Sequence, residues 1–189
     1  MKIILGSGSK WRADELRKAG IEFTQMSPDI NEKMIRDTDP KKLTMALAHA
    51  KADALLPKIT DPALLITSDQ VVVCDGKILE KPENKDEARA FLNLYATHPP
   101  GIVNAVVITN TGTGKRIEAF DEARIFYKPS ITEVIEEVLK DEEIMTCAGA
   151  LQSEHELMVS HMDHLEGSMD SFTGMPIALV QKMLKEAAA

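Results

Sequence analysis

The 189-residue chain has little that would tie it to a membrane or to an oxidising compartment. Near its N-terminus only three consecutive large apolar residues, 3–5, precede glycine and serine, too few for a signal peptide or a membrane span. The two cysteines, Cys74 and Cys147, form neither a CxxC pair nor a metal-ligand spacing, so we expect both to be small buried residues. These absences predict a cytoplasmic protein with no membrane partner.

An excess of basic residues is also missing. The 22 lysines and arginines are outnumbered by 30 acidic residues, which gives a formal net charge of -8. Partners such as nucleic acids and anionic membranes usually require a basic surface that releases their counterions. We therefore expect no nucleic-acid partner, and a phosphate-binding site has to be a local cluster of cations. The acidic stretch 133–143 is typical of a solvated helix face and indicates no function.

The length and composition of the chain are those of an ordinary globular protein. One hydrophobic core can serve 189 residues, of which 44% are hydrophobic, and there is no low-complexity tract, linker or internal repeat. We expect a single domain over residues 1–189. Helical and strand patterns alternate, and both hairpins and β-α units occur, which predicts an α/β fold with a mixed sheet.

The same patterns predict where the elements lie. Apolar or β-branched runs predict strands at residues 2–5, 21–26, 64–67, 71–74, 77–80, 102–110 and 116–127. Apolar residues at helical spacing and capping residues predict helices that begin after Ser9, at Asp39-Pro40, at Lys85, at Ser130 with Glu133 as its capping-box partner, and after Pro176. We expect the last helix to fray beyond Leu184.

The segment SGSKWR, residues 7–12, lies between an expected strand and an expected helix and is the first candidate for chemistry. Its hydroxyls, its backbone N–H groups and the guanidinium of Arg12 are suited to hold a phosphate. Taken alone, the segment is more typical of a serine N-cap followed by a solvent-exposed arginine. It lacks the GK[ST] ending of a P-loop and the third glycine of a dinucleotide-binding fingerprint.

Asp69 is the second candidate because it is a carboxylate within the nearly apolar run LLITSDQVVV. Removing an unpaired carboxylate from water is costly, so Asp69 has to be paired, metal-bound or facing a cleft. A function is favoured, and the alternative is an aspartate that caps backbone groups at a bulge or turn. We expect the polar residues 68–70 to interrupt the strand. Lys81, in EKP, is by itself typical of a surface lysine before a turn proline.

Together these fragments resemble the Maf family over essentially the whole chain. SGSKWR resembles the family's opening of serine, any residue, serine, proline, any residue and arginine, although Lys10 replaces the proline and residues 95–104 depart from the family's serine-glycine turn. The resemblance implies an elongated, two-lobed α/β fold with a central twisted sheet and a cleft between the lobes, similar to inosine triphosphate pyrophosphatases. The later motifs follow in the family's order: DINEK (29–33), AKADA (50–54), SDQVV (68–72), EKP (80–82), CAGALQSE (147–154) and LEGSMDSFTGMP (165–176).

The resemblance implies a house-cleaning enzyme that hydrolyses a nucleoside triphosphate to its monophosphate and pyrophosphate. The substrate carries roughly four negative charges, which an acidic protein can bind only where cations gather. The residues expected to bind the phosphates are Ser7, Ser9, Arg12, Lys51 and Lys81.

By the same resemblance, Asp69 is the general base that activates the attacking water. Glu32 and Asp69 are expected to hold a divalent cation, Mg2+ or Mn2+, because carboxylate oxygens suit such ions. The alternative for Glu32 and for Lys51 is an ordinary solvated charge. The expected partner is the nucleoside triphosphate, and a homodimer stays open.

Three further residues resemble the family's specificity positions: Trp11, Gln70 and Glu154. This set resembles the 7-methyl-GTP type rather than the dTTP/UTP type. N7-methylated guanine is a cation that an indole can stack against, and a carboxylate can accept hydrogen bonds from its N1–H and amino groups. The alternative for Trp11 is packing over the helix. DINEK, LEKP and SEHEL are also similar to the eukaryotic branch of the family, whose substrates we do not assume.

Other readings of the family stay open. The chain could be a nucleotide-sensing regulator of septum formation that binds triphosphates without significant hydrolysis, or a dTTP/UTP-specific pyrophosphatase. Asp69 favours the enzyme, because a sensor needs no general base between phosphate-binding cations. The SDQ and CAG motifs disfavour an inosine or xanthosine triphosphate pyrophosphatase.

Overall fold

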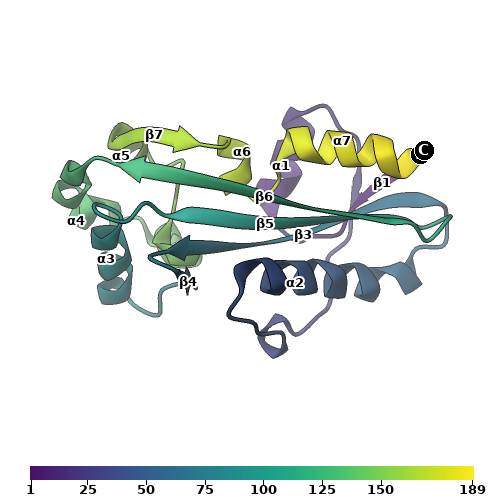
Figure 1. Ribbon diagram of the computed structural model, residues 1–189, viewed down its shortest axis with the longest axis horizontal. Coiled ribbons are helices and arrows are strands. Elements are labelled where there is room, and N and C mark those ends of the chain that lie inside the picture. The colour runs from purple at the N-terminus through teal and green to yellow at the C-terminus, as the bar shows by residue number, and fades with distance from the viewer. The chain divides into compact units, whose positions relative to one another are not determined.

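The computed structural model describes residues 1–189 (Figure 1). It contains one mixed seven-stranded sheet. The strand order is β2-β1-β3-β5-β6-β7, with β4 paired to β3 off this path. β2 and β3 run parallel to β1, whereas β4 and β7 run antiparallel to β3 and β6. The expected α/β class with a mixed sheet is confirmed. The strands are β1 (Lys2–Leu5), β2 (Thr24–Gln25), β3 (Ala63–Cys74), β4 (Lys77–Leu79), β5 (Gly101–Asn110), β6 (Arg116–Tyr127) and β7 (Met162–Glu166).

The long helices begin where capping residues predict. Ser9 caps the helix Lys10–Lys18 by accepting the N–H of Arg12. Asp39 caps the helix Pro40–Leu55, which has Pro40 in its first turn. None of the helices is long and apolar enough to span a bilayer. The α-helices are α1 (Lys10–Lys18), α2 (Pro40–Leu55), α3 (Lys85–Leu94), α4 (Ile135–Val138), α5 (Glu156–Ser160), α6 (Met169–Phe172) and α7 (Ile177–Ala188), and the 3-10 turns are η1 (Glu32–Met34), η2 (Leu56–Lys58), η3 (Pro129–Glu133), η4 (Glu142–Thr146) and η5 (Ala148–Ala150).

The chain forms two compact units. The first comprises residues 1–70, 104–121 and 173–189. Alternate side chains of its strands pack on opposite faces, as a pleated strand requires. Leu5 and Ile66 pack with residues of α1 and α7, whereas Ile4 and Leu65 pack with residues of α2 (Figure 1). The sheet of this unit therefore lies between helices on both faces.

The second unit comprises residues 71–103 and 122–172. Its core joins α3, Tyr95 and the last part of β6 to the short helical turns between 129 and 160. Tyr95 is 1% exposed and is the largest of its fully buried side chains. Both cysteines are free thiols, and Cys74 is buried as expected, whereas Cys147 is half-buried.

Strand β3 differs from the prediction because residues 68–70 do not interrupt it. Ala63–Cys74 is one continuous strand, and Ser68 and Asp69 are buried within it. Strand continuity needs backbone pairing rather than apolar side chains, and the polar side chains here have partners. Thr67 Oγ1, for example, donates to the carbonyl of Ala48 on α2 at 2.9 Å. The side chains of Thr67, Ser68 and Asp69 are thereby buried with hydrogen-bond partners.

Three further predictions of element bounds were wrong. The second strand is confined to Thr24–Gln25, and Ser130 lies within a 3-10 turn and makes no side-chain cap. The final helix runs to Ala188 and does not fray beyond Leu184. Its last carbonyl groups have partners, because the Asn110 side chain donates to Ala187 O at 2.9 Å and Lys115 Nζ donates to Glu186 O at 2.9 Å.

Candidate functional site

The loop between β1 and α1 is folded by its own serines. The Ser9 N–H donates to Ser7 Oγ at 3.1 Å, and Ser9 Oγ accepts the N–H of Arg12 at 3.3 Å. From β2, Gln25 Nε2 donates to Ser7 O at 2.7 Å. The expected N-cap role of Ser9 is confirmed, and the two hydroxyls hold the loop at the start of α1. Gln25, which the sequence analysis did not single out, fixes one carbonyl of this loop.

Arg12 is buried rather than solvent-exposed. Its side chain crosses from α1 to β3, where Nη1 donates to the Ser68 carbonyl at 2.8 Å, and the residue is only 9% exposed. Burial lowers the pKa of Arg12, and the charges of Asp69 and Glu32 oppose this shift. The reading of Arg12 as an ordinary surface arginine is therefore wrong.

Lys51 lies on the buried face of α2, one turn from both Leu47 and Leu55. Its ammonium is 2.5 Å from Asp69 Oδ1 and 2.9 Å from Glu32 Oε1. The side chain is 7% exposed, so its charge has to be compensated within the protein. The reading of Lys51 as a solvated charge is excluded by this burial.

Asp69 is the buried carboxylate at the centre of the cluster. It is 7% exposed. Burial raises the pKa of Asp69, whereas the positive charges of Lys51 and Arg12 and the hydrogen bond from Lys51 lower it. The alternative of an aspartate that caps backbone groups at a bulge is wrong, because Asp69 lies within a regular strand and accepts a hydrogen bond from Lys51 Nζ.

Glu32 brings the second carboxylate of the cluster. It begins the 3-10 turn η1, and its side chain is 54% exposed. Because Glu32 and Asp69 contact the same ammonium of Lys51, their nearest oxygens lie within the sum of two hydrogen-bond distances. Hard oxygen donors so close together fit a divalent ion such as Mg2+, which typically binds through one or two carboxylates plus substrate phosphates. No group of three or more histidine, cysteine, aspartate or glutamate residues could hold a metal by itself, so substrate and water oxygens would have to complete the shell.

Gly174 packs directly against two residues of the site. Its φ of +80° is in the left-handed region, and a Cβ atom there would lie 2.2 Å from Gln70 Oε1 and 2.9 Å from Arg12 Nε. The Ser68 hydroxyl faces the carbonyl of Gly174 at 3.4 Å. Only glycine therefore leaves room for the side chains of Arg12 and Gln70. The sequence signal for Gly174 was its place in the segment LEGSMDSFTGMP. That segment gave no sign of close packing against Arg12.

The structure brings together seven of the predicted site residues within the first unit: Ser7, Ser9, Arg12, Glu32, Lys51, Asp69 and Gln70. Trp11 adjoins Arg12 on α1 and is 46% exposed, so its indole is accessible rather than packed away. Lys81 and Glu154 are exposed residues of the second unit. Their assignment to the site stays a prediction.

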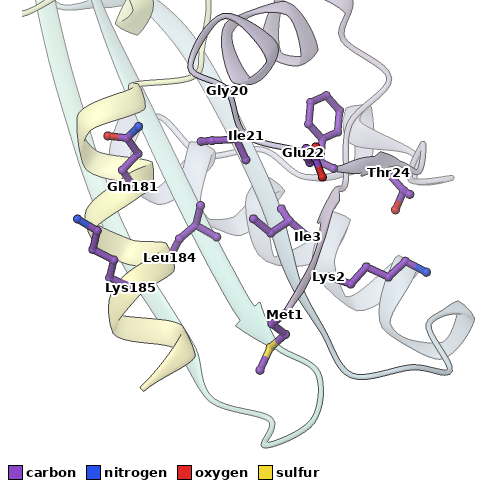
Figure 2. Close-up of a pocket in the computed structure, with 11 residues that line it drawn as sticks. Met1, Lys2, Ile3, Gly20, Ile21, Glu22, Thr24, Gln181, Leu184 and Lys185 are labelled. Atoms are coloured by element: carbon purple, nitrogen blue, oxygen red, sulfur yellow. The ribbon is translucent and has the colours of Figure 1, made fainter.

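A broad groove of about 890 Å³ lies elsewhere on the first unit (Figure 2). Its lining comes from β1, from residues 20–24 and from α7, and includes Ile3, Leu184 and Lys185. None of the predicted site residues lines it. Size alone therefore does not identify the functional site, whose defining feature is the buried group of charges around Asp69.

Comparison with known proteins places this chain in the family that its motifs resemble. The family model described as "Maf-like protein" matches residues 2–187. The "7-methyl-GTP pyrophosphatase" of Dictyostelium discoideum is 39% identical, over 98% of this chain and 97% of that protein. A protein of the same name from Idiomarina loihiensis is 33% identical, over 98% of this chain and 94% of that protein.

More distant similarities complete the comparison. A "Nucleoside triphosphate pyrophosphatase" from Synechococcus is 28% identical, over 97% of this chain and 93% of that protein. Among solved structures, a nucleoside-triphosphatase (dITP/XTP pyrophosphatase) from Mycobacterium abscessus has a TM-score of 0.41 and 13% identity, over 68% of this chain and 74% of that chain. Since the family model spans nearly all residues and two relatives exceed 30% identity over almost their whole length, the chain belongs to the Maf family.

Proposed function

We propose that this protein hydrolyses a nucleoside triphosphate to the monophosphate and pyrophosphate, as a single Maf domain that removes unwanted nucleotides from the cellular pool. The names of the similar proteins support this reaction. The observation that carries it is the burial of Asp69 beside Lys51 and Arg12, because a buried carboxylate between two cations suits acid-base chemistry next to bound phosphate. A protein that only sensed nucleotides would not need a general base at this position.

Asp69 is the group to which we assign the proton of the attacking water. The water oxygen would bond to the α-phosphorus while the bond from that phosphorus to the bridging oxygen of pyrophosphate breaks. Burial raises the pKa of Asp69, which makes the carboxylate a stronger base, and the charges of Lys51 and Arg12 oppose this shift. Lys51 also fixes the direction of the carboxylate through its 2.5 Å contact.

The substrate brings more negative charge than the cluster of Arg12, Lys51, Asp69 and Glu32 can neutralise. Arg12 and Lys51 together compensate Asp69 and Glu32, so the four groups sum to zero, whereas the substrate brings roughly four negative charges. Further positive charge is therefore required, and we assign it to Lys81 and to a divalent ion. Mg2+ or Mn2+ held by Glu32 and Asp69 would neutralise phosphate oxygens of the leaving pyrophosphate.

For the base, 7-methylguanine is the substrate that suits the side chains best. Trp11 presents an accessible indole beside Arg12, and an indole face attracts a cationic ring. Glu154 is the acceptor we assign to the guanine N1–H and amino groups, and Gln70 is the third residue of this set. The alternative of a dTTP- or UTP-specific enzyme makes no use of a cation-binding indole.

The role of Asp69 predicts a large loss of turnover in Asp69→Asn. The amide keeps the size of the side chain but is not a base, so kcat for pyrophosphate release should fall by about two orders of magnitude or more. Steady-state assays with Mg2+ or Mn2+ measure this. Asp53→Asn, at an exposed ion pair on α2, is the matched control and should keep normal turnover. Near-normal kcat in Asp69→Asn would show that another group activates the water.

Base selection predicts that 7-methyl-GTP has a higher kcat/KM than GTP, dTTP or UTP. Trp11→Ala should reduce the preference for the methylated base by about tenfold, the size of a cation-π contact of 1 to 2 kcal/mol. Glu154→Gln should reduce the preference for guanine, because it places a donor opposite donors. Phe120→Ala removes another exposed aromatic ring and serves as the control. Unchanged substrate ranking in both variants would contradict the assignment.

The packing of Gly174 predicts that a single methyl group disturbs the site. Gly174→Ala should lower kcat/KM by about tenfold or more, because Cβ would push Gln70 and Arg12 from their places. Gly20→Ala is the matched control, since Gly20 also has a positive φ, of +70°, but has no atom within 4 Å of the added carbon. Both variants should lose about 1 kcal/mol of stability from the left-handed backbone. Equal kcat/KM in the two would show that the close approach has no role in the reaction.

A further inference from the structure

The turn at residues 147–150 contains one residue, Ala150, in a backbone conformation that its side chain disfavours. Gly149 has a φ of +61°, and the next residue, Ala150, has a φ of +51° although it has a side chain. Left-handed backbone at a residue other than glycine is strained and persists only where neighbours enforce it. The contacts around Gly149 show which neighbours do so.

The peptide groups of Gly149 are held from two sides. Its N–H donates to the carbonyl of Glu80 at 2.8 Å, and its carbonyl accepts the Tyr95 hydroxyl at 2.5 Å. A Cβ at Gly149 would lie 2.6 Å from the Tyr95 oxygen and 2.9 Å from Val72 Cγ1, so the backbone is packed as closely as glycine allows. All these groups belong to the second unit. The turn is thus clamped between the end of α3 and the segment that follows β4.

The Tyr95 hydroxyl donates its hydrogen bond to the Gly149 carbonyl from a buried position. Its ring stacks on Tyr127 with centroids 6.2 Å apart, and burial raises its pKa well above the usual value, so the hydroxyl stays protonated and donates. The stacked residue, Tyr127, makes no corresponding hydrogen bond. The Tyr127 hydroxyl is also buried but has no hydrogen-bond partner.

The clamp ends next to a residue of the proposed reaction. Glu80, whose carbonyl receives the Gly149 N–H, directly precedes Lys81. The Lys81 charge also acts on Cys147 in the turn. Burial raises the pKa of Cys147, and the positive charge of Lys81 opposes this rise. An exposed lysine on an irregular segment has many conformations, and a fixed backbone at residue 80 restricts where its ammonium can reach.

We propose that Tyr95 is a positioning residue, which acts through the backbone of Gly149 to fix the backbone next to Lys81. The proposal rests on the proposed function in one respect, the assignment of Lys81 to the phosphates. The clamp itself is a property of the fold and can be tested without any substrate.

The test compares Tyr95→Phe with Tyr127→Phe in the full chain. Both variants keep the stacked rings and lose one buried hydroxyl, but only Tyr95→Phe loses a hydrogen bond. Hydrogen exchange of the amides at 147–151, followed by mass spectrometry, should be about fivefold faster in Tyr95→Phe, the size of one neutral hydrogen bond, and unchanged in Tyr127→Phe. Equal exchange in the two variants would overturn the clamp, whatever the activity.

Kinetics then test the link to Lys81. With 7-methyl-GTP and GTP as probes, Tyr95→Phe should raise KM about fivefold and leave kcat within about twofold, while Tyr127→Phe should match the wild type. In a Lys81→Met background, Tyr95→Phe should change KM by less than about twofold, since the group it positions is absent. An undiminished effect in that background would overturn the positioning role. If the wild type released no pyrophosphate from any triphosphate, the proposed function and the link to Lys81 would both fail, and the exchange result would still decide the clamp.

Discussion

The ion pair between Asp69 and Lys51 is the constraint on which the first unit depends. A carboxylate within strand β3 is taken out of water, and that cost is offset only if a cation is buried beside it. Helix α2 supplies the cation because Lys51 occupies the stripe that Leu47 and Leu55 bury against the sheet. The position of α2 on the sheet is therefore also the position of the charge. Displacing that helix would leave Asp69 unpaired.

Arg12, the second cation of the cluster, contacts parts of the chain that are far apart in the sequence. Arg12 starts from α1, ends at the Ser68 carbonyl of β3 and passes Gly174, whose missing side chain leaves it space. Burial of these groups places them in a low-dielectric surrounding where their mutual interactions are stronger than in water. The cost is that the cluster must be complete, because each charge depends on its partner. A site of this kind is preorganised before a nucleotide arrives.

Much of this could be predicted from the sequence, and the misses have physical reasons. Asp69 could be identified because a charge in an apolar run has few explanations. Arg12 could not be judged alone, since a helix N-terminus gives no sign of whether a side chain turns inward to another strand. The i, i+4 spacing of Leu47, Lys51 and Leu55 was a readable signal for a lysine on the buried face of its helix. The hydrogen bond of Tyr95 to Gly149 depends on tertiary packing and had no local signal.

Attack of water on the α-phosphorus is decided by a single turnover in water labelled with ¹⁸O. Mass spectrometry of the products of 7-methyl-GTP or GTP then locates the label. If water attacks the α-phosphorus, one labelled oxygen appears in the nucleoside monophosphate and none in the pyrophosphate. A label in pyrophosphate, or release of orthophosphate with a nucleoside diphosphate, would contradict it.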